Sequence, residues 1–324
     1  MHKQAMVRKK QKEIADRWTG DINNPLVSIS CITFNQEQYI AQALEGFLIQ
    51  ETSFPFEILV HDDASTDNTA AIIKEYEKKY PDIIKPIYQQ KNQYSQGNDV
   101  SEINIKRAKG KYIAFCEGDD FWTDPSKLQK QVDYLEKNPN CTACAARSQI
   151  YNDTEPTQEL MPKEPGNRFI SIEEIIEKGA TQAPTQTIVV KKEAFYNYRR
   201  LNVKCLVGDY PMLLYWGFVG QIYSLDEVFS VYRQNALNSW SCKQKQSFSV
   251  KKRNIVSIMK MLNAFNSFSG YKYNNVIFKK KISLLPIRVA SWNMIPYVLS
   301  GSISNFFFFI PLIVKKILKK GVKK

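Results

Sequence analysis

Cysteine and histidine are scarce in this chain of 324 residues. Six cysteines and two histidines leave few side chains for a zinc or redox centre. Cys141 and Cys144 have the CxxC spacing, but the sequence contains no second such pair. We therefore interpret both as buried strand cysteines and not as zinc ligands or a redox pair.

Several common sequence signatures are also missing. The segment "MHKQAMVRKKQKEIADRW" at the start is polar and does not resemble a secretory signal peptide, so we expect a reducing, cytoplasmic location. The patterns GxxxxGK[ST] and GxGxxG do not occur, which argues against an ATP P-loop and a dinucleotide fingerprint. Internal repeats are not evident.

Acidic residues stop at Glu227. Residues 228–324 contain 18 Lys and Arg and no Asp or Glu, whereas the first 227 residues contain 27 basic and 32 acidic residues. An acidic body is thus joined to a strongly basic tail. This asymmetry predicts a polyanionic partner, either nucleic acid or anionic lipid.

The basic tail includes an uncharged segment, residues 289–314. Polar residues and prolines dilute its apolar run, so three structures are open: a segment in the bilayer interface, a membrane span, or a packed helix. Aromatic residues with flanking lysines favour an anionic membrane surface. We expect no nucleic acid partner, because the apolar block Phe306–Val314 offers nothing to phosphates.

The body alternates between β-rich apolar runs and helical patterns, which predicts an α/β domain with a largely parallel sheet. Strands are expected at 26–34, 56–60, 83–89, 111–116, 142–146 and 186–190. Helices are expected at 37–50, 70–80, 124–138 and 171–179, with another beginning near 209. Asp124 is a candidate N-cap, and Ser171 with Glu174 forms a candidate capping box.

Acidic residues follow two of these expected strands. Asp62 and Asp63 end the run "FEILVHDD", and "CEGDDFW" follows "KYIAF". Ligands of such sheets bind beyond the carboxyl ends of the strands, so the two clusters converge if their strands are neighbours. Capping by Ser65–Asp67 explains the helix that follows but explains Asp62 and Asp63 poorly.

The second cluster has the spacing of a cation site. Glu117 and Asp119 lie on one side of an extended segment, as required to hold Mg²⁺ or Mn²⁺ with phosphate oxygens completing the shell. A turn at Gly118 is the simpler interpretation. We interpret His61 as structural. For Trp122, Tyr215 and Trp216 we favour packing in the core over stacking on sugar rings.

Together these motifs resemble the family 2 glycosyltransferases of the GT-A fold. The similarity covers "VSISCITFNQEQYIAQALEGFLIQ", "FEILVHDDASTDNT" and "GKYIAFCEGDDFWTDPSKLQKQVDYL", and extends over about residues 25–235. Bacterial enzymes that build capsular or lipopolysaccharide chains are the most similar members. The resemblance implies a Rossmann-like, mostly parallel sheet flanked by helices.

The resemblance also implies roles for site residues. The donor nucleotide would contact Thr33, Phe34, Asn35, Asp62, Asp63, Glu117 and Gly118. Glu117-Gly118-Asp119 matches the DxD motif with Glu in place of the first Asp. Asp119 would bind a divalent metal, Mn²⁺ or Mg²⁺, with Asp120 in support.

Two further residues match the family pattern. Asp209 stands at the catalytic base position, although Gly208 precedes it where many members have Glu. Arg233 in "SVYRQN" stands where some relatives carry a positively charged or histidine-containing loop over the diphosphate, and is a candidate supporting residue.

The implied function is inverting transfer of a sugar from a UDP- or GDP-sugar to a glycan or lipid-linked acceptor, at the inner face of a bacterial membrane. A non-catalytic membrane-associated protein with a degenerate transferase fold is the alternative, suggested by Glu117 and Gly208. We expect a basic, helical N-terminal tail at 1–24, the transferase domain at 25–240, and a basic, partly apolar, membrane-associating helical region at 241–324.

Overall fold

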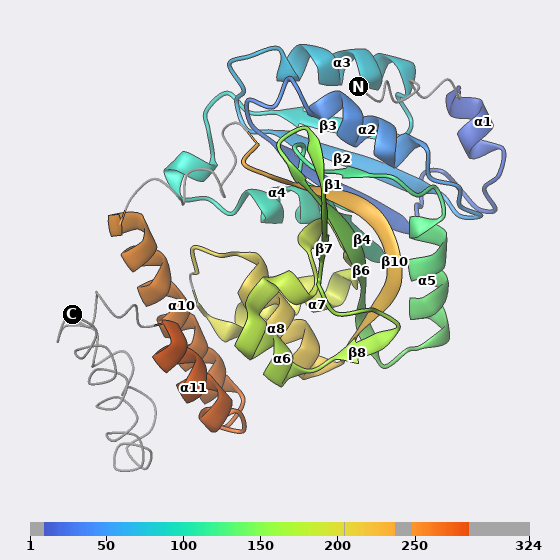
Figure 1. The fold of residues 1–324 in the computed structure, drawn as a ribbon. Helices are drawn as coiled ribbons and strands as arrows, with labels where there is room; N and C mark the ends of the chain where they lie inside the picture. The colour runs from blue at the N-terminus through green and yellow to red at the C-terminus, as the bar shows by residue number, and fades with distance from the viewer. Residues whose placement is uncertain (1–9, 204, 237–247, 285–324) are drawn as a thin grey trace.

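A twisted β-sheet forms the centre of the computed structural model, with helices on both of its faces (Figure 1). The structure describes residues 10–203, 205–236 and 248–284. Within these residues ten strands join in one sheet, whose main path runs β3-β2-β1-β4-β9-β6-β10-β5. The α/β fold class predicted from the sequence is confirmed.

The first half of the sheet is parallel and built from the four buried runs that the sequence predicts. Its strands are β1 (Val27–Thr33), β2 (Phe56–Asp62), β3 (Ile84–Tyr88) and β4 (Tyr112–Phe115). β1 is central and pairs in parallel with β2 on one side and β4 on the other. The carboxyl ends of β2 and β4 therefore flank the end of β1.

The second half of the sheet is mixed. It contains β5 (Phe121–Trp122), β6 (Cys141–Asn152), β7 (Glu155–Met161), β8 (Arg168–Ile170), β9 (Val189–Lys191) and β10 (Gln221–Gln234). β9 joins the halves by pairing antiparallel with β4 and β6, while β10 runs parallel to β6. Cys141 and Cys144 lie buried in β6 as free thiols.

The helices divide between the two faces according to the alternation of strand side chains. Ile58 and Val60 pack in the core cluster with α2, α3 and α5, whereas Leu59 packs in the cluster with α4, α6, α7 and α8. The helices are α1 (Gln11–Ala15), α2 (Ile40–Leu48), α3 (Thr69–Lys79), α4 (Val100–Arg107), α5 (Lys127–Lys137), α6 (Ile172–Lys178), α7 (Lys192–Asn197) and α8 (Asp209–Val219). Trp122, Tyr215 and Trp216 are buried, as the core interpretation predicts.

Two helix starts test the capping predictions. Ser171 caps α6 as predicted, by accepting a hydrogen bond from the Glu174 amide at 3.1 Å, but the Glu174 carboxylate pairs with Arg168 instead of closing the expected capping box. The start predicted for α5 is wrong, since the helix begins at Lys127 with Ser126 as N-cap. Asp124 instead accepts from the Ser126 amide at 2.7 Å, closing a tight turn ahead of the helix.

A close approach of α2 to β5 helps to place the acidic loop between β4 and β5. A Cβ on Gly46 would lie 2.7 Å from the carbonyl oxygen and 2.8 Å from the amide nitrogen of Trp122. Glycine is therefore required where the helix backbone meets this strand. The contact fixes the far end of the loop that contains Glu117 and Asp119.

Two more helices follow the sheet, α10 (Phe248–Phe268) and α11 (Asn274–Leu284). α10 packs on α8 through Phe265 and Phe268, whose rings meet that of Phe218. None of the helices in the described segments is both long and apolar enough to cross a bilayer. The uncharged segment 289–314 lies outside the described residues, as do the tail residues 1–9.

Candidate active site

Both acidic loops are hydrogen-bonded to the end of β1. The Asp63 amide donates to the Thr33 carbonyl and the Gly118 amide to the Ile32 carbonyl, each at 3.0 Å. Gly118 must be small, because a Cβ there would lie 2.5 Å from Gln36 Oε1 and 2.9 Å from Thr33 Oγ1. The structure thus brings the two clusters together on either side of β1.

The residues after β1 form the floor between these loops. Thr33 is buried, and its Oγ1 has no hydrogen-bond partner among the described atoms. Asn35 adopts a left-handed backbone conformation (φ 52°), and its Oδ1 accepts from the Thr66 amide at 2.7 Å. Phe34 is half-buried. This turn is held by the loop that follows β2.

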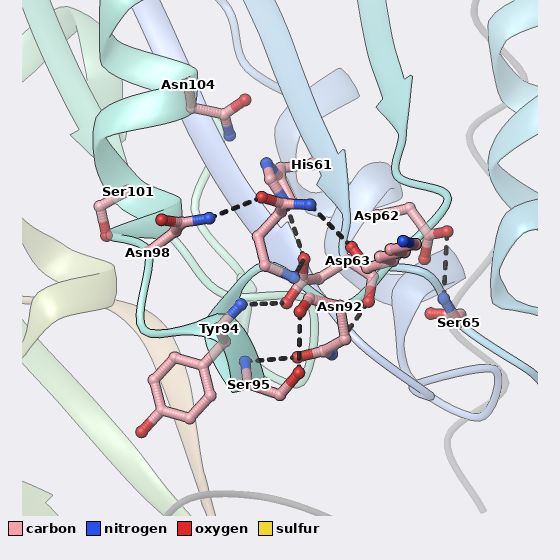
Figure 2. Close-up of polar contacts among 12 residues, drawn as sticks. His61, Asp62, Asp63, Ser65, Asn92, Tyr94, Ser95, Asn98, Ser101 and Asn104 are labelled. Carbon is pink, nitrogen blue, oxygen red and sulfur yellow. Dashed lines mark hydrogen bonds and ion pairs between the residues drawn. The ribbon is translucent and has the colours of Figure 1, made fainter.

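Asp62 and Asp63 are both buried but have different surroundings (Figure 2). Asp63 accepts from the amides of Gln93 (2.7 Å) and Tyr94 (3.1 Å). Asp62 Oδ2 is 3.4 Å from the Ser65 amide, and Asp62 Oδ1 has no partner within the described structure. Burial raises the pKa of Asp62. Asp62 therefore has a free acceptor atom, whereas Asp63 is engaged on both oxygens.

The loop from Glu117 to Asp120 is a tight turn, closed by the Asp120 amide on the Glu117 carbonyl at 3.1 Å, so the alternative of a turn at Gly118 is confirmed and the extended segment expected there is wrong. Glu117 reaches solvent, while Asp119 and Asp120 are buried. Although part of the Glu117 side chain reaches solvent, desolvation by the surrounding protein and the charges of Asp119 and Asp209 raise its pKa to about 8, and burial raises the pKa of Asp119 as well. The cluster of acidic residues predicted from the sequence is present, and a positively charged ligand would favour its ionised forms.

Asp209 begins α8 and belongs to the same acidic neighbourhood, since its charge contributes to the raised pKa of Glu117. Its Oδ2 is 3.4 Å from Thr185 Oγ1. Burial raises the pKa of Asp209 above its usual 3.8. A partly solvated carboxylate with a raised pKa is suited to accept a proton at neutral pH.

Arg233 lies in β10, beneath the Glu117–Asp120 loop, and is 4% exposed. Its guanidinium donates to the carbonyl of Asp119 and to Gln42 Oε1, and it lies 4.5 Å from the ring centroid of Phe121. Its amide donates to Asp120 Oδ1 at 2.8 Å. Arg233 thus braces the acidic loop from within β10.

We expect Arg233→Lys to lower the free energy of unfolding by about 2–4 kcal/mol, because a lysine cannot reproduce the planar donor set and leaves buried carboxylates poorly compensated. Urea unfolding followed by circular dichroism measures the change. Arg17→Lys, in an exposed pair with Glu51, is the control, with an expected change of at most about 0.5 kcal/mol. Equal midpoints for Arg233→Lys and wild type would contradict the bracing role.

Sequence reasoning missed Gln36 and did not identify the contact of segment 92–98 with Asp63. Gln36 borders Asp119 and offsets part of the rise in its pKa, and Gln36 Oε1 is buried without a partner in the described structure. Segment 92–98 covers Asp63. Gln36 directly follows Thr33–Asn35, which are predicted to line the nucleotide site, and this position is the only sequence signal that Gln36 belongs to the site.

A hollow of about 490 Å³ lies elsewhere, lined by Lys111, Glu136 and Lys191 among others. Lys111 and Lys191 stand where β4 begins and β9 ends, at the sheet edge opposite Glu117. None of the predicted site residues lines this hollow.

The fold and the strand-end acids define a GT-A type α/β protein. A family model described as "Glycosyl transferase family 2" matches residues 28–199, more than half of the chain. The chain belongs to glycosyl transferase family 2.

Related sequences and a solved structure are consistent with this family assignment. An uncharacterized protein of Mycobacterium bovis is 38% identical over 217 residues, 66% of this chain and 60% of that protein. TuaG of Bacillus subtilis, whose name assigns it to teichuronic acid biosynthesis as a glycosyltransferase, is 26% identical over 69% of this chain and 86% of its own. The S. aureus TarS 1–349 structure with UDP-GlcNAc has a TM-score of 0.56 at 16% identity, covering 90% of this chain and 87% of that one, which establishes the shared fold.

Proposed function

We propose that this chain transfers a sugar, with inversion, from a nucleoside diphosphate donor to a hydroxyl of a glycan or lipid-linked acceptor. The observation that carries the proposal is the convergence of the acid loops of β2 and β4 on the end of β1. Buried oxygens of Thr33, Asp62 and Asp119 have no partner there within the described structure. Such atoms are costly unless a ligand meets them.

Donor nucleotide recognition would use both sides of β1. Asp62 supplies a free acceptor on one side, next to the turn formed by Thr33, Phe34 and Asn35. Glu117 and the backbone of Gly118 lie on the other side. A nucleotide placed across β1 would therefore contact the β2 loop at one end and the β4 loop at the other, as in other sheets that bind ligands at strand ends.

A divalent cation fits the residues present. Asp119 Oδ1 is buried and unpartnered in the described structure, and Glu117 lies two residues away. The described residues form no cluster of three or more acidic, histidine or cysteine ligands, so substrate oxygens would have to complete the shell, as is usual for Mg²⁺ and Mn²⁺. When bound, the cation offsets negative charge on the departing diphosphate.

Asp209 would act as the general base. Its carboxylate accepts the proton of the acceptor hydroxyl as that oxygen bonds to the anomeric carbon. The bond from the anomeric carbon to the diphosphate oxygen breaks, and the nucleoside diphosphate leaves with the electron pair. One in-line displacement of this kind inverts the anomeric configuration. Asp120 and Arg233 would keep Asp119 in place.

The donor class and the pathway rest on the relatives. TarS was solved with UDP-GlcNAc, which supports a UDP-sugar, and a GDP-sugar would satisfy the same acidic loops. TuaG supports a role in bacterial surface polysaccharide synthesis, the process that also includes capsule and lipopolysaccharide chains. We propose such a polysaccharide as the product.

A cytoplasmic location, peripheral on the inner face of the bacterial membrane, completes the proposal. α10 and α11 carry the exposed cations Lys251, Arg253, Lys260 and Lys279, and the sequence contains no acidic residue after Glu227. This charge suits anionic lipid headgroups. It would keep the active site near a lipid-linked acceptor.

The test is a donor screen. Purified protein is incubated with UDP- and GDP-sugars and Mn²⁺, and the sugar released to water is followed by NMR before it mutarotates. We expect slow turnover of one donor, with the first product in the opposite anomeric configuration. Retention of configuration, or no turnover of any donor by protein that binds UDP or GDP, would contradict the proposal.

A further inference from the structure

The segment after β3, residues 92–98, lies across the carboxyl end of β2 (Figure 2). Asp63 holds it through three contacts. The Asp63 carboxylate accepts from the amides of Gln93 and Tyr94, at 2.7 and 3.1 Å. The Asp63 carbonyl accepts from Asn92 Nδ2 at 3.0 Å. Asp63 therefore holds the side chain of Asn92 at the start of the segment and the backbone amides of the next two residues.

The segment is also tied to itself. Asn92 Oδ1 accepts from the Ser95 amide at 2.7 Å, and Ser95 Oγ donates back to the Asn92 carbonyl at 2.8 Å. Asn98 Nδ2 donates to Gln93 Oε1 at 2.8 Å. The Tyr94 side chain projects from this frame and is 61% exposed. The segment is thus an ordered wall whose attachment to the sheet runs through Asp63.

His61 lies under this attachment. The ring is fully buried, and its Nε2 is 3.3 Å from Asp63 Oδ1. Because Nε2 faces a carboxylate, it carries the ring proton and donates, while Nδ1 has no partner in the described structure. Burial lowers the pKa of His61, so the ring is neutral near pH 7.

A packing role alone would not need a histidine. An apolar side chain fills a buried strand position without the cost of an unpartnered ring nitrogen. His61 makes its contact to the acid that anchors the segment 92–98, and Asp62, its neighbour with a free oxygen, faces Ser65 instead (Figure 2).

We propose that His61 is a positioning residue that acts through Asp63 to hold residues 92–98 as a preformed wall of the nucleotide site. This inference rests on the proposed function only in naming the nucleotide as the ligand. A wall that is already ordered lowers the entropy cost of binding. Loss of the His61 donor would free the Asp63 carboxylate to rotate and loosen both amide contacts.

The test compares His61→Leu, which removes the donor, with His61→Gln, whose side-chain amide nitrogen can replace Nε2. Hydrogen exchange of the free protein is measured by mass spectrometry. We expect the peptide containing Gln93 and Tyr94 to exchange about tenfold faster in His61→Leu, with the rest of β2 nearly unchanged, and His61→Gln to restore most of the protection. The Kd for UDP or GDP should rise about tenfold in His61→Leu, the effect of about one hydrogen bond, and should stay near the wild-type value in His61→Gln.

Ser28→Ala is the matched control, since Ser28 is buried at the opposite end of β1 and donates to Glu57 Oε1 at 2.6 Å. It should lower stability without a local change at residues 92–98. In an Asp63→Asn background, His61→Leu should add little further exchange. Equal protection of Gln93 and Tyr94 in wild type and His61→Leu, or identical behaviour of the Leu and Gln variants, would overturn the proposal. If Gln93 and Tyr94 exchange faster in His61→Leu but the wild-type protein binds neither UDP nor GDP, the positioning role stands and the proposed function is refuted.

Discussion

Asp209→Asn is expected to reduce sugar transfer by about 10²–10⁴-fold, the contribution of a general base. The amide is nearly the same size as the carboxylate but cannot take the proton of the acceptor hydroxyl. Since Asp209 lies at the start of α8 and its side chain makes a long contact of 3.4 Å to Thr185 Oγ1 within the described structure, the substitution should leave the fold intact. Affinity for UDP or GDP, measured by calorimetry, should stay within about twofold of wild type.

The control is Asp226→Asn, the same chemical change at an acid that pairs with Arg147. Asp226 lies in the first half of β10, whereas Arg233, beneath the acidic loop, lies near the end of that strand. The Asp226→Asn variant should transfer sugar at the normal rate. The pH profile adds a second readout. Burial raises the pKa of Asp209 above 3.8, so wild-type activity should fall as pH decreases through that raised value, and the residual activity of Asp209→Asn should lack this limb. Near-normal turnover by Asp209→Asn would show that another group is the base.

Asp119→Asn is expected to weaken UDP or GDP binding by about 10²-fold in the presence of Mn²⁺, and transfer by at least as much. Asp119 has the buried, unpartnered carboxylate oxygen of the β4 loop, so its charge is the one most available to a cation. Titration calorimetry should show that EDTA lowers wild-type affinity to the level of the variant and has no effect on the variant.

Asp99→Asn is the matched control for Asp119→Asn. Asp99 caps α4, for which asparagine is equally good, and its pair with Arg199 is exposed, so stability should fall by at most about 0.5 kcal/mol and nucleotide affinity should not change. Wild-type binding that is insensitive to EDTA, or an Asp119→Asn variant that keeps Mn²⁺-dependent affinity, would contradict the cation site.

The strand ends could be predicted from the sequence because their signal is local. A buried apolar run followed by acids is visible without knowing the neighbours, so Asp62, Asp63, Glu117 and Asp119 could be located at one edge of the sheet. Their convergence required one assumption, that the strands carrying them are neighbours. That assumption is wrong, since β1 lies between β2 and β4, but the two loops still converge because both are hydrogen-bonded to the end of β1.

The remaining features depend on contacts between distant segments. Asp63 binds amides about 30 residues away, and Arg233 reaches the β4 loop from a strand more than 100 residues later. The sequence does not predict helix α4, because its apolar periodicity is weak and one of its two buried residues, Asn104, is polar. Asn104 Nδ2 donates to the carbonyls of Cys31 and Leu59, and this pairing across two strands stabilises a helix that apolar periodicity does not reveal.

The central claim is that the ends of β1, β2 and β4 form one nucleotide diphosphate site, and a crystal structure with UDP and Mn²⁺ tests it most directly. The account predicts the diphosphate and the cation at Asp119, with the nucleoside extending past Thr33 towards Asp62. A nucleotide bound in the hollow lined by Lys111, Glu136 and Lys191, or one that leaves Asp62 and Asp119 untouched, would contradict it.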